Sequence, residues 1–177
     1  MSVTPFSTVG YLTYKRTYAR TLDNNKTEEF NDTVERVVNA CNEQLRAGFT
    51  EEEKNRLTQY MLSLKGIVAG RFLWQLGTDT VERLGLASLQ NCAFTVVDDP
   101  VRPFTWAMDM LMLGAGVGYN IQKVNVDKLP KVHKNFITPQ RYDNAGADFI
   151  VPDTREGWVQ LLGKTLKSAF LAKEKHT

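Results

Sequence analysis

The segment from residue 92 to 124 constrains the fold most, because it has the pattern of a strand, an apolar helix, a glycine-rich turn and a second strand. Residues 92–97, Cys-Ala-Phe-Thr-Val-Val, form a compact β-rich run. Pro103 suits the first turn of a helix that continues through the apolar stretch 106–113, which we expect to be deeply buried. The glycines that follow lead into a second predicted strand over 119–124. This order predicts the α/β class.

Two amphipathic helices are predicted before this segment. Apolar residues recur at spacings of three and four over residues 30–45, with polar residues between them. The next helix begins after Thr50, because Glu53 follows it at the spacing of a capping box. We expect Gly66 and Gly70 to mark the end of this helix. Its expected buried stripe includes Leu57, Tyr60, Met61, Leu64 and Ile67.

The remaining regions have less regular patterns. Residues 1–26 are aromatic and basic and indicate an extended or short helical lead-in. Residues 71–90 are irregular, with glycines as turn signals. A last helix begins at Asp153, with Glu156 at capping-box spacing, and its apolar face extends over residues 158–170.

Composition and charge exclude several classes of protein. Of the 177 residues, 42% are hydrophobic and 24% charged, which excludes a disordered or collagen-like chain. The net charge of +2 is too small, and the basic residues too scattered, for direct DNA binding. No apolar run approaches the roughly 20 residues of a membrane span, and residues 1–10 lack signal-peptide features. Two cysteines do not make a disulfide framework, so we expect a cytoplasmic protein.

The two cysteines have different settings. Cys41 falls inside the apolar stripe of its predicted helix, which favours a small buried hydrophobe. Cys92 lies where a loop meets a strand, and a thiol at such an edge is accessible to a substrate or to a second thiol. From the residues alone, both a buried and a redox role stay open for Cys92.

The glycine-rich turn and the two histidines are candidate ligand sites. A dinucleotide fingerprint follows a strand and opens a helix, whereas the glycines at 114–118 follow a helix and precede a strand. A tight turn therefore explains them, although exposed amides there can still hydrogen-bond a ligand. His133 and His176 have no partner at metal-ligand spacing, so no metal site is predicted. The basic residues near Tyr14, namely Lys15, Arg16 and Arg20, suit either an anionic ligand or a solvated face.

Five motifs carry a resemblance to a known family when they are taken together and in this order. The chain resembles the N-terminal part of the adenosylcobalamin-dependent, monomeric class II ribonucleoside-triphosphate reductases. The motifs are Tyr14-Lys-Arg-Thr-Tyr-Ala-Arg20, Gly70-Arg-Phe-Leu-Trp74 with Gly77-Thr-Asp79, Leu89-Gln-Asn-Cys92, Gly114-Ala-Gly-Val-Gly118 and Val151-Pro-Asp-Thr-Arg-Glu-Gly-Trp158.

The resemblance implies roles for four residues. Cys92 corresponds to one of two cysteines that reduce the ribonucleotide after a thiyl radical has taken its 3′-hydrogen, and that are reopened by a thioredoxin-type reductant. Asn91 corresponds to a residue that helps hold the substrate, and Gly116 to a glycine whose backbone approaches the bound nucleotide. Asp99 lies where related reductases contact a nucleotide effector.

The family also implies an architecture that this sequence does not complete. Residues 1–85 correspond to a mainly helical region, 86–124 to the start of a ten-stranded α/β barrel, and 125–177 to the start of an insertion that helps form the effector site. The radical cysteine and most of the cobalamin-binding region are not found, so we expect a complementary C-terminal fragment. The alternatives are a non-catalytic remnant or nucleotide-binding module, and a reductase that uses a di-iron subunit in place of adenosylcobalamin.

Overall fold

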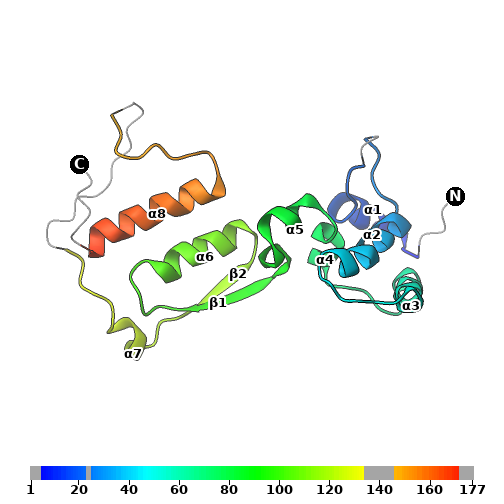
Figure 1. Cartoon of the computed structure of the whole chain (residues 1–177), viewed down its shortest axis with the longest axis horizontal. Helices are drawn as coiled ribbons and strands as arrows, with labels where there is room; N and C mark the ends of the chain where they lie inside the picture. Colours follow the sequence, from blue (N-terminus) through cyan, green and yellow to red (C-terminus); the bar gives the residue numbers. More distant parts are fainter. Residues whose placement is uncertain (1–4, 23–24, 134–145, 172–177) are drawn as a thin grey trace. The chain divides into compact units, whose positions relative to one another are not determined.

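The computed structural model describes residues 5–22, 25–133 and 146–171, and the chain divides into two compact units, Met1–Gln90 and Asn91–Thr177 (Figure 1). The finer division into three regions stays a prediction, and part of the third region lies outside the described residues. The first unit consists of the helices α1 (Thr8–Thr17), α2 (Phe30–Glu43), α3 (Glu51–Leu62), α4 (Gly70–Gln75) and α5 (Asp79–Leu84) and the 3₁₀ helix η1 (Leu86–Leu89). The second consists of β1 (Cys92–Val96), α6 (Arg102–Met112), β2 (Gly116–Asn120), α7 (Lys123–Val126) and α8 (Arg155–Phe170).

The core of the first unit forms around α2, which confirms the first predicted amphipathic helix. Seven of its 14 residues are buried, as its three-and-four spacing requires. The opening segment is also helical: α1 buries Tyr14, whose ring lies 5.6 Å from that of Phe6 and 5.5 Å from that of Phe30. These aromatic contacts attach α1 to the start of α2.

The second predicted helix is α3, and its capping box is confirmed. The Thr50 amide donates to Glu53 Oε2 at 2.9 Å, and the Glu53 amide donates to Thr50 Oγ1 at 3.3 Å. Of the predicted buried stripe, Met61 is fully buried and Leu57 is partly buried against the core, but the other three residues are exposed. The helix ends before Leu64, whose φ is +54°, so Leu64 and Ile67 lie past its end and are exposed. Tyr60, also placed in that stripe, is exposed as well.

The sequence predicted that residues 71–90 are irregular, and this is wrong. They contain α4, α5 and η1. Each is six residues or fewer, too short for a 3.6-residue period to stand out in the sequence. Gly70 begins α4 and does not end the preceding helix. A Cβ on Gly70 would lie 3.0 Å from the Tyr18 ring, so a glycine here lets α4 approach the end of α1 closely.

A buried ion pair links the start of α2 to α4. Arg36 donates through Nε to Glu28 Oε1 at 2.6 Å and through Nη2 to Glu28 Oε2 at 2.9 Å, and it also donates to the carbonyl oxygens of Leu73 and Leu76. Thr33 Oγ1 donates to Glu28 Oε2 at 2.7 Å. Burial opposes the ionisation of Glu28, but the hydrogen bonds from Arg36 and Thr33 outweigh it and hold the pKa of this carboxyl below its ordinary value.

Gly77 is required by the close packing of this region. Its φ is +80°, and a Cβ there would lie 2.6 Å from Arg36 Cγ and 3.2 Å from Ala40 Cβ. Gly77→Ala is therefore expected to lower the free energy of unfolding by about 2 to 4 kcal/mol, from backbone strain and overpacking together. Gly48→Ala is the control, because Gly48 also has a positive φ, of +70°. A Cβ on Gly48 would have no described atom within 4 Å outside its chain neighbours. In urea denaturation, equal losses for the two variants would contradict the role of the close contact.

In the second unit, β1 and β2 pair in parallel and α6 connects them, which gives the β-α-β arrangement that the α/β prediction requires. The first strand begins at Cys92, as predicted. The second begins at Gly116 and ends at Asn120, whereas the sequence predicted 119–124. The difference arises because Gly116 and Gly118 themselves pair with β1.

One face of this sheet is covered by α6, and α8 packs against α6 (Figure 1). The expected deep burial of α6 is wrong, because only Pro103, Ala107 and Met110 of its residues are buried. Ala107 and Met110 are buried, but Trp106 is 36% and Leu111 53% exposed. An apolar surface of α6 is thus left uncovered by the described residues.

The N-terminus of α8 differs from the predicted cap. The capping residue is Thr154, whose Oγ1 accepts a hydrogen bond from the Gly157 amide at 3.1 Å, and not Asp153. Arg155, in the first turn, forms an ion pair with Asp109 of α6. This contact fixes the start of α8 against α6.

Candidate active site

Cys92 is the accessible thiol of the two in the chain. It begins β1 and is exposed, whereas Cys41 is buried in α2 at 8% exposure. Burial raises the pKa of the Cys41 thiol, which disfavours its thiolate. The different settings predicted for the two cysteines are confirmed.

The parallel pairing brings the three residues of the predicted substrate site together. Cys92 stands opposite Gly116 in the register, and the Gly116 amide donates to the carbonyl oxygen of Asn91 at 2.8 Å. Residues from two separate motifs thus become neighbours at one end of the sheet. Their roles in binding and catalysis remain proposals.

Side-chain alternation shows which face of the sheet these residues share. The ring of Tyr119 lies 6.2 Å from that of Phe104 in α6, so Tyr119 and its strand partner Thr95 face α6. Neighbouring residues of a strand point to opposite faces. Cys92 and Gly116 therefore face away from α6, and both are exposed.

Gly114 and Gly116 are glycines for different reasons: Gly114 has a backbone conformation that favours glycine, whereas Gly116 leaves open space. Gly114 has a φ of +86°, which a turn after α6 requires and which glycine adopts without strain. Gly116 does not have such a φ, and a Cβ on it would meet no atom nearer than the Asn91 carbonyl oxygen at 3.8 Å. Nothing among the described residues requires glycine at position 116. Its bare backbone leaves space beside Cys92 for a ligand to approach.

Asp99 has a structural role that the sequence did not indicate. Its Oδ1 accepts hydrogen bonds from the amides of Val101 and Arg102, at 2.8 and 2.6 Å, where α6 begins. The hydrogen bonds from Arg102 and Val101 lower the pKa of the Asp99 carboxyl. Its predicted contact with an effector nucleotide is a separate matter and stays a proposal.

Asp99→Ala is expected to lower the free energy of unfolding by about 1 kcal/mol at pH 7, the usual loss for a helix cap. Because the pKa is lower in the folded state, the stabilisation is complete above the unfolded pKa of about 3.9 and is lost as the pH falls through the folded value. Chemical denaturation at pH 7 and at pH 3 measures this. Asp99→Asn, which can still accept, should lose less, and an equal loss at both pH values would contradict the account.

The contacts of Lys15 favour the solvated-face alternative for the basic opening segment. Tyr14 is buried, and Lys15 donates to Glu29 Oε1 at 2.9 Å and to the carbonyl oxygens of Thr27 and Glu28. The Lys15 charge is thus already neutralised by an acidic neighbour. The solvated-face alternative fits this arrangement better.

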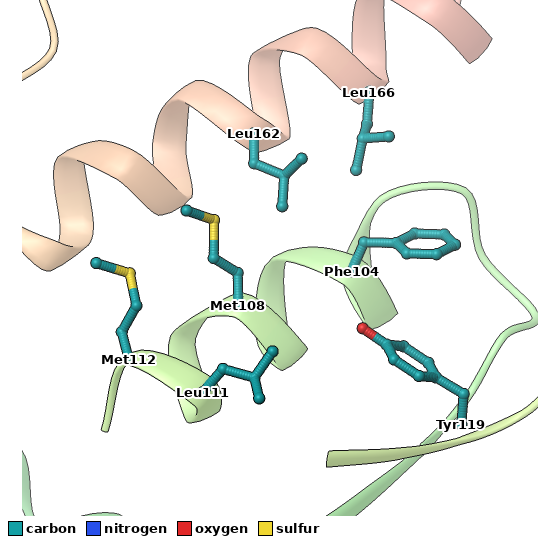
Figure 2. A pocket seen from close by; sticks show the side chains of 7 residues that line it. All are labelled: Phe104, Met108, Leu111, Met112, Tyr119, Leu162 and Leu166. Carbon is teal, nitrogen blue, oxygen red and sulfur yellow. The ribbon is translucent and has the colours of Figure 1, made fainter. Parts of the chain in front are cut away.

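An apolar groove lies between α6, α8 and β2, all in the second unit (Figure 2). The Tyr119 hydroxyl is the one polar side-chain group among the residues that line it, so the groove does not match the amide-fringed rim of a cobalamin. The lining residues are Phe104, Met108, Leu111, Met112, Tyr119, Leu162 and Leu166.

Residues 5–22, 25–133 and 146–171 contain neither a candidate metal centre nor a membrane-spanning helix. In these ranges, no three His, Cys, Asp or Glu side chains converge as metal ligands, and no helix is long and apolar enough to cross a membrane. His176 lies outside them.

Comparisons with known proteins agree with the resemblance. Residues 1–78 match the ribonucleotide reductase alpha domain. The chain is 34% identical to an adenosylcobalamin-dependent ribonucleoside-triphosphate reductase of Euglena gracilis, over 93% of this chain and 24% of that protein. It is 32% identical to the enzyme of that name from Lactobacillus leichmannii, over 85% of this chain and 28% of that protein. A crystal structure of a B-12 dependent (class II) ribonucleotide reductase superposes with a TM-score of 0.71 at 26% identity, covering 94% of this chain and 31% of that one.

The chain is thus homologous to a segment of the ribonucleotide reductases. Within them, its relatives are the adenosylcobalamin-dependent ribonucleoside-triphosphate reductases. It spans about a quarter of the length of the relatives it matches.

Proposed function

We propose that this chain supplies one side of the active site of a ribonucleotide reductase, which converts ribonucleoside triphosphates to 2′-deoxyribonucleoside triphosphates for DNA synthesis. The observation that carries the proposal is the exposed thiol of Cys92 beside the bare backbone of Gly116. A nucleotide over Gly116 would lie within reach of that thiol. The names of the relatives supply the substrate class and the reaction.

In the proposed reaction, Cys92 is one of two reducing thiols. The ribose loses its 2′-hydroxyl as water and gains a hydrogen, while two thiols give up two electrons and two protons and become a disulfide. A thioredoxin-type reductant then restores both thiols by thiol–disulfide exchange. Cys41 does not suit the second thiol, because it is buried in the core around α2. The second thiol therefore belongs to the part of the reductase outside this chain.

Radical initiation and cofactor binding belong to that other part as well. The relatives are named as adenosylcobalamin-dependent. In the proposed reaction this cofactor would supply the radical that starts it. Because the apolar groove between α6, α8 and β2 does not match a corrin, the proposed role of this chain does not include holding the cofactor. What this chain contributes is the position of Cys92 and, through Asn91 and Gly116, the placing of the nucleotide.

A complementary reductase segment is the expected protein partner. The uncovered side of the sheet and the exposed apolar residues of α6 support this, since such surfaces are normally buried by further structure. Asp99 is proposed to contact a nucleotide effector through the part of its carboxylate that does not cap α6.

The test is reconstitution. The chain is mixed with a polypeptide that carries the remaining length of the Lactobacillus leichmannii reductase, together with adenosylcobalamin, a dithiol reductant and a ribonucleoside triphosphate. We expect deoxyribonucleotide to form when both polypeptides are present. Binding of the two polypeptides and of nucleotide without any turnover would instead support a non-catalytic nucleotide-binding module.

A further inference from the structure

We infer that Phe94 is a further residue of this site, and that its ring forms the apolar wall against which the sugar of a nucleotide lies beside Cys92. The inference rests on the proposed function for the identity of the ligand. It rests on the geometry of the sheet for the position of the ring.

Phe94 shares the open face of the sheet with Cys92. The two residues are two positions apart on β1, so their side chains point to the same side and their Cα atoms are about 6.5 to 7 Å apart. Phe94 is 63% exposed, although it is the largest side chain of the strand. A phenylalanine on a strand face is normally covered, so its exposure indicates a surface that contacts something outside this chain.

Gly118 explains where the ring lies. It is the strand partner of Phe94, and a Cβ on Gly118 would come within 3.3 Å of Phe94 Cδ2. The ring therefore leans over β2 at position 118, in space that any larger residue would occupy. Gly116, by contrast, has no such ring above it, since a Cβ there would meet only the Asn91 carbonyl oxygen at 3.8 Å.

The two glycines thus have different roles on the same face. Gly118 accommodates the ring of Phe94, and the missing side chain of Gly116 leaves open space beside Cys92, which we call the recess. The recess has the thiol on one side, bare backbone below it and an aromatic ring at its end. A ribose is small and has an apolar carbon face, so its chemistry suits such a recess.

The first experiment measures how fast Cys92 is alkylated by iodoacetamide and by a bulky fluorescein maleimide. A Cys41→Ala background makes Cys92 the reacting thiol. We expect Phe94→Ala to raise the rate with the bulky reagent by roughly threefold or more and the rate with iodoacetamide less, because removal of the ring opens the recess. Tyr119→Leu is the matched control, since it removes an aromatic ring from the neighbouring strand on the opposite face.

Gly118→Ala provides a second variant, because its added Cβ must displace the ring without removing it. It should also change the rate with the bulky reagent. Unchanged rates in both Phe94→Ala and Gly118→Ala would overturn the inference. Equal increases in Phe94→Ala and Tyr119→Leu would also overturn it, because they would indicate general loosening of the sheet.

The second experiment uses the reconstituted reductase. Phe94→Ala is expected to raise KM for the nucleotide by about tenfold, the size expected from one lost aromatic contact, with kcat lowered less. Phe94→Tyr, which keeps the ring, should restore the wild-type KM. If the wild-type mixture turns over and Phe94→Ala has an unchanged KM for the nucleotide, the inference about Phe94 is contradicted and the proposed function is not. Absence of turnover in the wild-type mixture would contradict the proposed function, and the alkylation rates would still decide whether the ring borders the thiol.

Discussion

Cys92→Ser is expected to abolish steady-state deoxyribonucleotide formation in the reconstituted enzyme, with a loss of at least about a thousandfold, as for removal of an essential catalytic group. Serine is close in size to cysteine, so the exposed start of β1 should keep its structure. A hydroxyl, however, cannot give up electrons to form a disulfide. The effect should therefore fall on turnover and not on folding.

Cys41→Ala is the matched control for this prediction. It removes the other thiol of the chain, which is buried, and is expected to leave turnover within about twofold once the variant is folded, since this thiol has no catalytic role here. Turnover is followed by chromatography of the nucleotides, and folding by circular dichroism. Similar losses for Cys41→Ala and Cys92→Ser would contradict the assignment of Cys92 as the reducing thiol.

Arg36→Ala is expected to cause the largest loss of stability, about 3 to 5 kcal/mol in the free energy of unfolding. The substitution leaves the Glu28 carboxylate buried at 3% exposure without its cation, and it removes the donors to the carbonyl oxygens of Leu73 and Leu76. Lys15→Ala is the control. Its ion pair with Glu29 is partly exposed, so its loss should be no more than about 1 kcal/mol.

The same pair predicts a pH dependence. Glu28 has a folded pKa below its ordinary value, so its contribution is complete near neutral pH and is lost as the pH falls through the folded value. The difference in unfolding free energy between the wild type and Glu28→Gln should therefore narrow in acid. Urea denaturation at pH 7 and at pH 4 measures it, and a difference that widens in acid would contradict the assignment.

Local signals in the sequence predicted the parts of the fold that depend on neighbouring residues. The capping box of Thr50 and Glu53 and the periodicity of α2 are set within a few positions, and both are confirmed. The ion pair of Glu28 and Arg36 was not predicted, because it connects to carbonyl groups of α4, up to 40 residues further along. The strand at Gly116 was missed because glycine has low strand propensity, and pairing with β1 overrides it.

The candidate site was predictable in its residues but not in its geometry. The position of Cys92 at the start of a strand was predicted from the residues around it. Its proximity to Gly116 depends on the parallel register, which no short motif specifies. Phe94 was not singled out, although its position two residues after Cys92 in a strand is the signal that would have placed it on the same face.

The central claim is that Cys92 is half of a redox pair whose other half lies outside this chain. The most direct measurement is to run the reconstituted enzyme for a single turnover without an external reductant, and then to map disulfides by mass spectrometry. We expect Cys92 to be linked to a cysteine of the complementary polypeptide, in proportion to the deoxyribonucleotide formed. Formation of deoxyribonucleotide with Cys92 still a free thiol would contradict the account.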